Sequence, residues 1–230
     1  MAELVLALDV PGGKQAFSLI ERLPELRWVK IGSVLMTREG PDFIRTLVSR
    51  GLKVFLDLKW HDIPNTVAEA AAAGRDLGVS MATVHVLGGQ PMLEAASAAA
   101  GPELALVGVT VLTSHDSATY AVSVGRSSVD LHREVERQAV LGVAAGLRGV
   151  VCSAHEVSLL RSRLGPGPFI VVPGLRRGSD AVGDQVRVAT AKDAVSQGAT
   201  HLVVGRPVLQ AADPAAAFDE FLREARCVVS

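Results

Sequence analysis

The sequence predicts an α/β protein with the single-domain (β/α)8 architecture known as the TIM barrel. Eight short apolar runs recur at intervals of about 30 residues, which is the rhythm of such a barrel. Segments rich in alanine, leucine, glutamate and arginine alternate with these runs, as helices would. The length of 230 residues suits one barrel of this kind, so we interpret residues 1–230 as one domain.

The predicted strands are almost continuously apolar and do not alternate between polar and apolar residues. This pattern is typical of parallel strands covered by helices. In chain order they are Leu4–Val10, Trp28–Gly32, Lys53–Lys59, Met81–Val86, Leu104–Leu112, Gly149–Cys152, Phe169–Gly174 and His201–Arg206.

The predicted helices lie between these strands, and several carry start or stop signals. Thr66–Glu69 has the sequence of a capping box, and Asp213 stands before Pro214 as an N-cap before the first helical position. Three glycines are expected to end helices just before a strand: Gly51, Gly78 and Gly198. Clear helical segments are Lys14–Leu23, Pro41–Arg50, Pro91–Ala100 and Val135–Gly146.

A doubly wound open sheet is the alternative fold. Such a sheet normally has fewer strands and often a glycine-rich first turn with the pattern GxGxxG. The segment DVPGGKQ after the first apolar run lacks this pattern, and the chain contains no GxxxxGK[ST] motif. The two longest stretches without periodicity, Thr113–Val129 and Gly174–Thr190, are candidate active-site loops.

Composition excludes several classes of function. With 23 basic and 24 acidic residues the formal charge is −1, so the chain has no overall basic excess for nucleic acid. The two cysteines, Cys152 and Cys227, form no CxxC pair and indicate a reducing compartment. The first ten residues have no basic segment and their apolar run ends at Asp9. We therefore expect a cytoplasmic protein without a signal peptide or membrane span.

The third predicted strand carries charges that an apolar strand does not need. Asp57 and Lys59 are two residues apart and are expected to point into the barrel, since residues at this spacing share one face of a strand. Asp62 follows just beyond the strand, and Lys30 lies on the neighbouring strand. Burying unpaired charges costs several kcal/mol, so we expect these groups to pair. A purely structural ion-pair network is the alternative, and Asp62 could simply begin a turn.

Polar residues at other strand ends extend this candidate site, because barrel enzymes place their active sites at the carboxyl ends of the strands. Asp9 and Thr113 stand at such ends. His85 is interpreted as a hydrogen-bonded barrel residue rather than a ligand, and the six histidines show no spacing typical of a metal site.

The last two strands are followed by groups suited to a phosphate. Gly174–Gly178 reads GLRRG, and Gly205 precedes Arg206. Small backbone and guanidinium groups at these loops are typical of phosphate sites in barrels. The residues alone therefore predict a barrel enzyme for a small phosphorylated substrate, although Arg206 could also be an ordinary surface arginine.

The segment DLKWHDIPNT resembles the signature of the orotidine 5′-phosphate decarboxylases. Further matches are LALDV near the start, VKIG, TVLTS, PGLR followed by GDQ, and VVGRP followed by ADP, so the resemblance covers essentially the whole chain. It implies decarboxylation of orotidine 5′-phosphate to uridine 5′-phosphate in the last step of de novo pyrimidine synthesis, without metal or cofactor.

The resemblance also implies roles for individual residues. Lys59 would protonate C6 of the pyrimidine, and Asp57 would face the departing CO₂. Lys30 and Asp62 would complete the charge array. The second subunit of a homodimer would supply Asp62, Ile63 and Thr66, although Thr66 could simply cap a helix.

The remaining implied contacts are with the substrate's ribose, base and phosphate. Asp9 and Lys30 would contact the ribose, and Thr113 the base. One departure is Arg177, which stands where the family usually has proline, and this puts the local shape of that loop in question. The implied phosphate-binding residues are Arg176, Gln185, Gly205 and Arg206.

Two other functions stay open. A magnesium-dependent sugar-phosphate decarboxylase or aldolase of the same superfamily has a similar D-x-K-x-x-D core, but it needs an acidic residue on the second strand, where this chain has Lys30. A non-catalytic nucleotide-binding module is the second alternative, and the presence of Lys59 argues against it.

Overall fold

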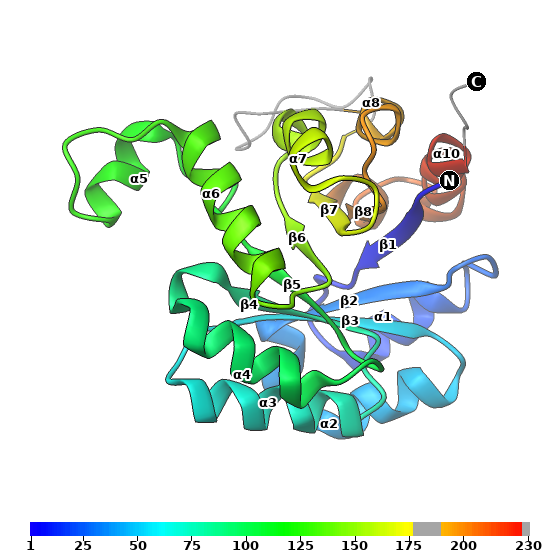
Figure 1. The fold of residues 1–230 in the computed structure, drawn as a ribbon. Helices are drawn as coiled ribbons and strands as arrows, with labels where there is room; N and C mark the ends of the chain where they lie inside the picture. Colours follow the sequence, from blue (N-terminus) through cyan, green and yellow to red (C-terminus); the bar gives the residue numbers. More distant parts are fainter. Residues whose placement is uncertain (177–189, 227–230) are drawn as a thin grey trace.

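The computed structural model describes residues 1–176 and 190–226, and its eight parallel strands close into a barrel (Figure 1). Each strand pairs with the next one in the sequence, and β8 pairs with β1 to close the ring. The predicted TIM barrel is therefore confirmed, and the open-sheet alternative is wrong. The strands are β1 (Glu3–Ala7), β2 (Trp28–Gly32), β3 (Lys53–Trp60), β4 (Met81–His85), β5 (Ala105–Val109), β6 (Gly149–Val151), β7 (Phe169–Pro173) and β8 (His201–Val204).

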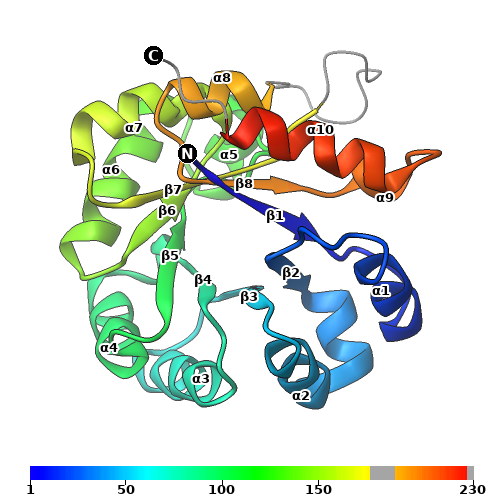
Figure 2. The same cartoon turned by 90° about the vertical axis from the view of Figure 1, so that its right-hand side faces the viewer.

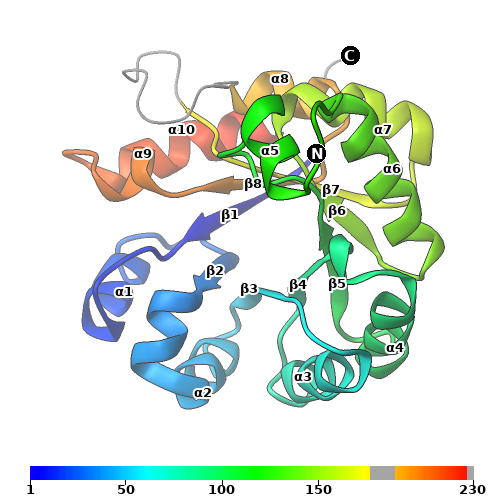
Figure 3. The same cartoon turned by 90° about the vertical axis from the view of Figure 1, so that its left-hand side faces the viewer.

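Helices surround the barrel, as Figures 2 and 3 show from opposite sides. None of the helices in the described residues is long and apolar enough to cross a membrane. The α-helices are α1 (Gly13–Ile20), α2 (Ser33–Ser49), α3 (Pro64–Asp76), α4 (Gln90–Ala100), α5 (Ser117–Ser123), α6 (Leu131–Ala144), α7 (Val157–Leu164), α8 (Ala191–Ser196), α9 (Arg206–Leu209) and α10 (Pro214–Arg226); two short 3₁₀ turns are η1 (Val86–Gly88) and η2 (Ala154–Glu156).

The strands separate two apolar cores. On β1, Leu4 and Leu6 pack outward against the helices, whereas Val5 and Ala7 point into the barrel. This alternation follows from the two-residue period of a strand. Both faces of the sheet are thus buried, which explains why the strands read as continuous apolar runs. The inner core consists of Val5, Ala7, Trp28, Phe55, Met81, Val107, Val171 and Val203.

The helix boundaries confirm some sequence signals and correct others. Asp213 caps α10, since its carboxylate accepts the backbone N–H groups of Ala215 and Ala216. The capping box predicted at Thr66–Glu69 is wrong, because α3 begins earlier, at Pro64, whose fixed φ favours the first helical turn. The glycines predicted to end helices do so at positive φ, a conformation that other residues rarely adopt: Gly51, Gly78 and Gly198.

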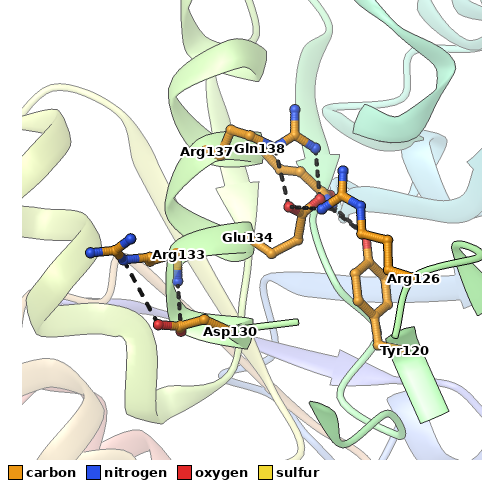
Figure 4. A network of polar contacts seen from close by, with 7 residues as sticks. All are labelled: Tyr120, Arg126, Asp130, Arg133, Glu134, Arg137 and Gln138. Carbon is orange, nitrogen blue, oxygen red and sulfur yellow. Dashed lines mark hydrogen bonds and ion pairs between the residues drawn. The ribbon is translucent and has the colours of Figure 1, made fainter. Parts of the chain in front are cut away.

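The stretch Thr113–Val129, predicted as a loop, contains the short helix α5, which projects from the barrel (Figure 1). A polar cluster fixes this segment to α6 (Figure 4). The carboxylate of Glu134 accepts hydrogen bonds from Arg137 at 2.6 Å, from Gln138 at 2.9 Å and from Tyr120 of α5 at 3.3 Å. The hydrogen bond from Arg137 outweighs the effect of burial and lowers the pKa of Glu134 to about 2.

A buried histidine closes the end of the barrel opposite the predicted site. The ring of His201 packs edge-on against Trp28 and Phe169, with centroids 5.4 and 4.8 Å away, and its Nδ1 lies 2.9 Å from the hydroxyl of Thr200. Burial, together with the charge of Lys53, lowers the pKa of His201 from 6.5 to about 4. The folded protein therefore holds this ring neutral.

Acidification should destabilise the protein through His201. The unfolded chain binds a proton at this ring below pH 6.5, and the folded protein does so only near pH 4. The neutral ring of His201 makes its full contribution to the free energy of unfolding above pH 6.5. This contribution, up to about 3 kcal/mol, is lost as the pH falls towards 4. Urea unfolding measured from pH 7 to pH 4 should show a smaller loss of unfolding free energy for His201→Leu than for the wild type, because leucine cannot be protonated. Equal losses in both proteins would contradict this assignment.

Candidate active site

Three pockets open at the carboxyl ends of the strands, and Lys30 of β2 lines all of them. The first, of about 520 Å³, lies over β1 to β3 and is also lined by Asp9, Asp57 and Lys59. The second, of about 190 Å³, lies at the ends of β7 and β8. The third, of about 170 Å³, lies over the barrel axis and shares Asp57 and Lys59 with the first. Polar groups predicted at the strand ends therefore line these cavities.

Asp57 lies at the centre of a row of alternating charges. Its Oδ1 is 2.8 Å from the Nζ of Lys59, and its Oδ2 is 3.5 Å from the Nζ of Lys30. Lys30 in turn lies 3.2 Å from Oδ1 of Asp9. The predicted pairing of Asp57, Lys59 and Lys30 is confirmed, and Asp9 extends the row. Leu56 and Leu58 pack on the helix side, also as predicted.

Asp57 is ionised in this environment. Its side chain is only 15% exposed, and burial alone would raise the pKa of the carboxyl group. The charges of Lys30 and Lys59 oppose this effect, as do hydrogen bonds from Lys59 and Thr83, and together they lower the pKa below its ordinary value. The site therefore presents a fixed carboxylate between two ammonium groups.

The backbone at Lys59 departs from regular strand geometry. Among the described residues it is the one non-glycine residue with positive φ, at 53°. Leu56 pairs with Ala82 and Trp60 with Val84, so β3 advances four residues where β4 advances two. This irregularity is a bulge, a feature that often re-aims side chains next to active sites.

Asp62, Ile63 and Thr66 lie beyond this bulge, at the start of α3, and are exposed. Oδ1 of Asp62 accepts a hydrogen bond from the backbone N–H of Ile63 at 2.6 Å. Within the part of the chain that the structure describes, Asp62 forms no ion pair with the row of Asp9, Lys30, Asp57 and Lys59. Pairing of Asp62 with Lys59 inside one subunit, which the residue spacing suggested, is thus not found.

Thr113 lines the pocket over the barrel axis, where most neighbours are apolar. Leu112 and Cys152 stand beside it. Burial raises the pKa of the Cys152 thiol far above its ordinary value, so this group stays protonated and chemically inert. A flat, largely apolar ligand could enter this pocket and reach Asp57 and Lys59.

Arg176, Gly205 and Arg206 line the pocket at the ends of β7 and β8, as predicted for a phosphate site. Gly205 also precedes α9. Guanidinium groups and backbone N–H groups together suit a phosphate or other anion. Gln185 and Arg177, also considered in the sequence, lie outside the described residues.

His85 at the end of β4 lies beside the array. Its ring is 5.6 Å from that of His61, and its Nδ1 is buried without a hydrogen-bond partner among the described residues, so the expectation of a hydrogen-bonded His85 is wrong for this atom. Burial and the nearby charges of His61 and Lys59 lower the pKa of His85. Residues 1–176 and 190–226 contain no group of three or more His, Cys, Asp or Glu residues arranged to hold a metal.

Two polar residues at the site were not predicted. Thr83 of β4 hydrogen-bonds to both Asp57 and Lys59. Arg38 of α2 lines the pocket over β1 to β3 and donates to the backbone carbonyl of Pro11. Thr83 lies inside an apolar run, and Arg38 reads as an exposed helical residue. Neither has a local sequence signal that points to the site.

The chain is similar to known proteins over nearly its whole length. Residues 2–221 match the family described as orotidine 5′-phosphate decarboxylase / HUMPS. A protein of Halorhodospira halophila (strain DSM 244 / SL1) named orotidine 5′-phosphate decarboxylase is 50% identical over 218 residues, which cover 93% of this chain and 92% of that protein. A protein of the same name from Alkalilimnicola ehrlichii is 47% identical over 227 residues, or 97% and 96% of the two chains.

Solved structures give the same result. The crystal structure of orotidine 5′-phosphate decarboxylase from Lactobacillus acidophilus superposes with a TM-score of 0.88 at 33% identity and covers 99% of this chain and 100% of that one. The enzyme of the same name from Pyrococcus horikoshii OT3 has a TM-score of 0.78 at 26% identity, with coverage of 98% and 100%.

Proposed function

Because the chain belongs to the orotidine 5′-phosphate decarboxylase / HUMPS family, we propose that it converts orotidine 5′-phosphate to uridine 5′-phosphate and CO₂. The chain is then a carboxy-lyase of pyrimidine synthesis, with residues 1–230 as one catalytic domain, and acts in the cytoplasm without a nucleic-acid or membrane partner. The observation that carries the proposal is the position of Asp57 between Lys30 and Lys59. Lys30 lines both the apolar pocket and the arginine-lined one.

The proposal assigns each part of this substrate to one of the pockets. The apolar pocket at Thr113 would take the pyrimidine, and Asp9 and Lys30 would hold the ribose. Arg176, Gly205 and Arg206 would hold the phosphate. This end of the site, together with Gln185, supplies binding energy remote from the reacting carbon, which can position the base and exclude water.

The chemical step needs a proton donor at C6. When the bond between C6 and the carboxylate breaks, CO₂ leaves and the electron pair stays on C6. The ammonium group of Lys59 stabilises this pair, donates a proton to C6 and later recovers a proton from water. Asp57 pairs with the ammonium group of Lys59 at 2.8 Å and would lie beside the substrate carboxylate. The repulsion between the two carboxylates is relieved as CO₂ leaves.

We propose that this chemistry proceeds without metal or cofactor. Asp57 already has an ammonium group on each side, at 2.8 and 3.5 Å. A magnesium ion bound to this carboxylate would meet two positive charges at short range, which opposes its binding. This arrangement favours the decarboxylase over a magnesium-dependent relative of the superfamily.

A homodimer would complete the site. Asp62, Ile63 and Thr66 are exposed, and Ile63, an apolar residue, is 66% exposed. Val34 and Leu87, at the starts of the segments after β2 and β4, are also apolar and exposed. Apolar side chains gathered near a catalytic rim suit an interface between two copies of the chain, across which Asp62 would reach the partner's Lys59.

The direct test is the loss of the characteristic absorbance of orotidine 5′-phosphate on addition of the purified protein, with uridine 5′-phosphate identified as product. We expect complete conversion. A folded protein that binds the substrate but leaves its absorbance unchanged would instead support a non-catalytic nucleotide-binding module.

A further inference from the structure

Thr83 occupies the one position of β4 that faces the bulge of β3. Between the pairs Leu56–Ala82 and Trp60–Val84, three residues of β3 stand opposite Thr83 alone. The register of the ladder shifts there, so a single residue of β4 cannot supply ladder partners for all the backbone groups of these three residues. Buried backbone groups that lose such partners need replacements.

The hydroxyl group of Thr83 supplies one replacement. It accepts a hydrogen bond from the backbone N–H of Lys59 at 2.8 Å. It also donates to Oδ1 of Asp57 at 3.0 Å, the same oxygen that receives the Nζ of Lys59 at 2.8 Å. One hydroxyl therefore bonds the backbone of the lysine and the carboxylate that holds its ammonium group.

The hydrogen bond from Lys59 to Thr83 involves a residue whose backbone is strained. Left-handed backbone conformations cost a residue other than glycine roughly 1–2 kcal/mol, and Lys59 adopts one, with φ at 53°. Such strain persists where surrounding groups enforce it. The side chain of Thr83 is buried, with 1% of the residue exposed, so water cannot replace its hydroxyl.

We propose that Thr83 is a positioning residue: its hydroxyl holds Lys59 in the left-handed conformation and orients Asp57, so that the ammonium group of Lys59 stays aimed into the pocket. Thr83 does not itself line the three pockets described above, and it acts through these two residues, which do. The inference deepens the proposed function and rests on it for its effect on turnover, whereas the geometric role does not depend on which substrate binds.

The test compares Thr83→Val, which removes the hydroxyl at nearly constant shape, with Thr83→Ser, which retains it. We expect Thr83→Val to lower kcat for orotidine 5′-phosphate by about 30- to 100-fold with KM changed by less than about threefold, since misplacement near 1 Å costs about this much. Thr83→Ser should stay within about threefold of the wild type.

Thr110 provides a matched control. It is also buried, and its hydroxyl donates to the backbone carbonyl of Val151 on a neighbouring strand at 2.9 Å. Within residues 1–176 and 190–226, its side chain forms no hydrogen bond with Asp9, Lys30, Asp57 or Lys59. Thr110→Val should lose a comparable amount of stability and keep its kcat. If Thr83→Val and Thr110→Val have the same kcat, the role of Thr83 is merely structural.

Crystal structures of the Thr83 variants separate this inference from the proposed function. In Thr83→Val we expect Lys59 to leave its positive φ or its Nζ to move out of hydrogen-bond distance of Asp57, whereas Thr83→Ser should preserve both. An unchanged Lys59 in Thr83→Val would overturn the inference whatever the reaction is. Lack of turnover by the wild type, with Lys59 displaced in Thr83→Val, would overturn the proposed function alone.

Discussion

Replacing Lys59 by alanine is expected to lower kcat for orotidine 5′-phosphate by about four orders of magnitude or more, because the site loses its proton donor and the positive charge beside C6 together. Asp57 would also lose its closest ion pair, at 2.8 Å. The measurement is the disappearance of substrate absorbance at saturating concentration, on protein whose folding is verified by circular dichroism.

Two further variants test whether the loss of activity is specific to the proton carried by Lys59. Lys59→Arg keeps the positive charge but holds its proton too firmly to give it to carbon, so it should stay nearly inactive. Lys53→Ala removes a lysine from the other end of the same strand, over the ring of Trp28, and should keep wild-type kcat. Turnover by Lys59→Ala within tenfold of the wild type would exclude Lys59 as the general acid.

Mixing two inactive variants is expected to restore activity if the site is shared between subunits. Asp57→Ala and Asp62→Ala should each be nearly inactive as pure dimers. In a mixed dimer, one site combines an intact Asp57 with an intact Asp62 from the other subunit. Half of the dimers are mixed after random exchange and each has one intact site, so about a quarter of wild-type activity should return.

A second mixture controls for indirect rescue. Asp57 and Lys59 belong to the same strand, so in a mixed dimer of Asp57→Ala with Lys59→Ala both sites are defective and no activity should return. Subunit exchange is verified by mass spectrometry of the dimers. If exchange occurs and the first mixture stays inactive, Asp62 does not act across the interface.

The sequence predicts the barrel well because the physical signal is strong. Strands buried on both faces must be apolar throughout, and every predicted run overlaps an observed strand. The strand ends are less well predicted, because the apolar pattern does not stop where the ladder stops. The run Leu104–Leu112 continues past the end of β5 at Val109, since Val111 and Leu112 line the pocket.

The charge array can be predicted from the sequence because burying a charge without a partner costs free energy. Charges on a buried strand need partners, so Asp57, Lys59 and Lys30 could be expected to meet, and they do. The left-handed backbone of Lys59 and the bulge opposite Thr83 could not be expected, because they depend on the register between two strands. The proposed contact of Asp62 with a second subunit could not be expected from residue spacing either, because spacing describes one chain alone.

We propose that this chain decarboxylates orotidine 5′-phosphate with its own side chains. The most direct measurement is the release of labelled CO₂ from carboxyl-labelled substrate by protein dialysed against EDTA, with and without added Mg²⁺. We predict one CO₂ for each uridine 5′-phosphate formed, at a rate that neither EDTA nor Mg²⁺ changes. Absence of labelled CO₂, or its release only after Mg²⁺ is restored, would contradict the claim.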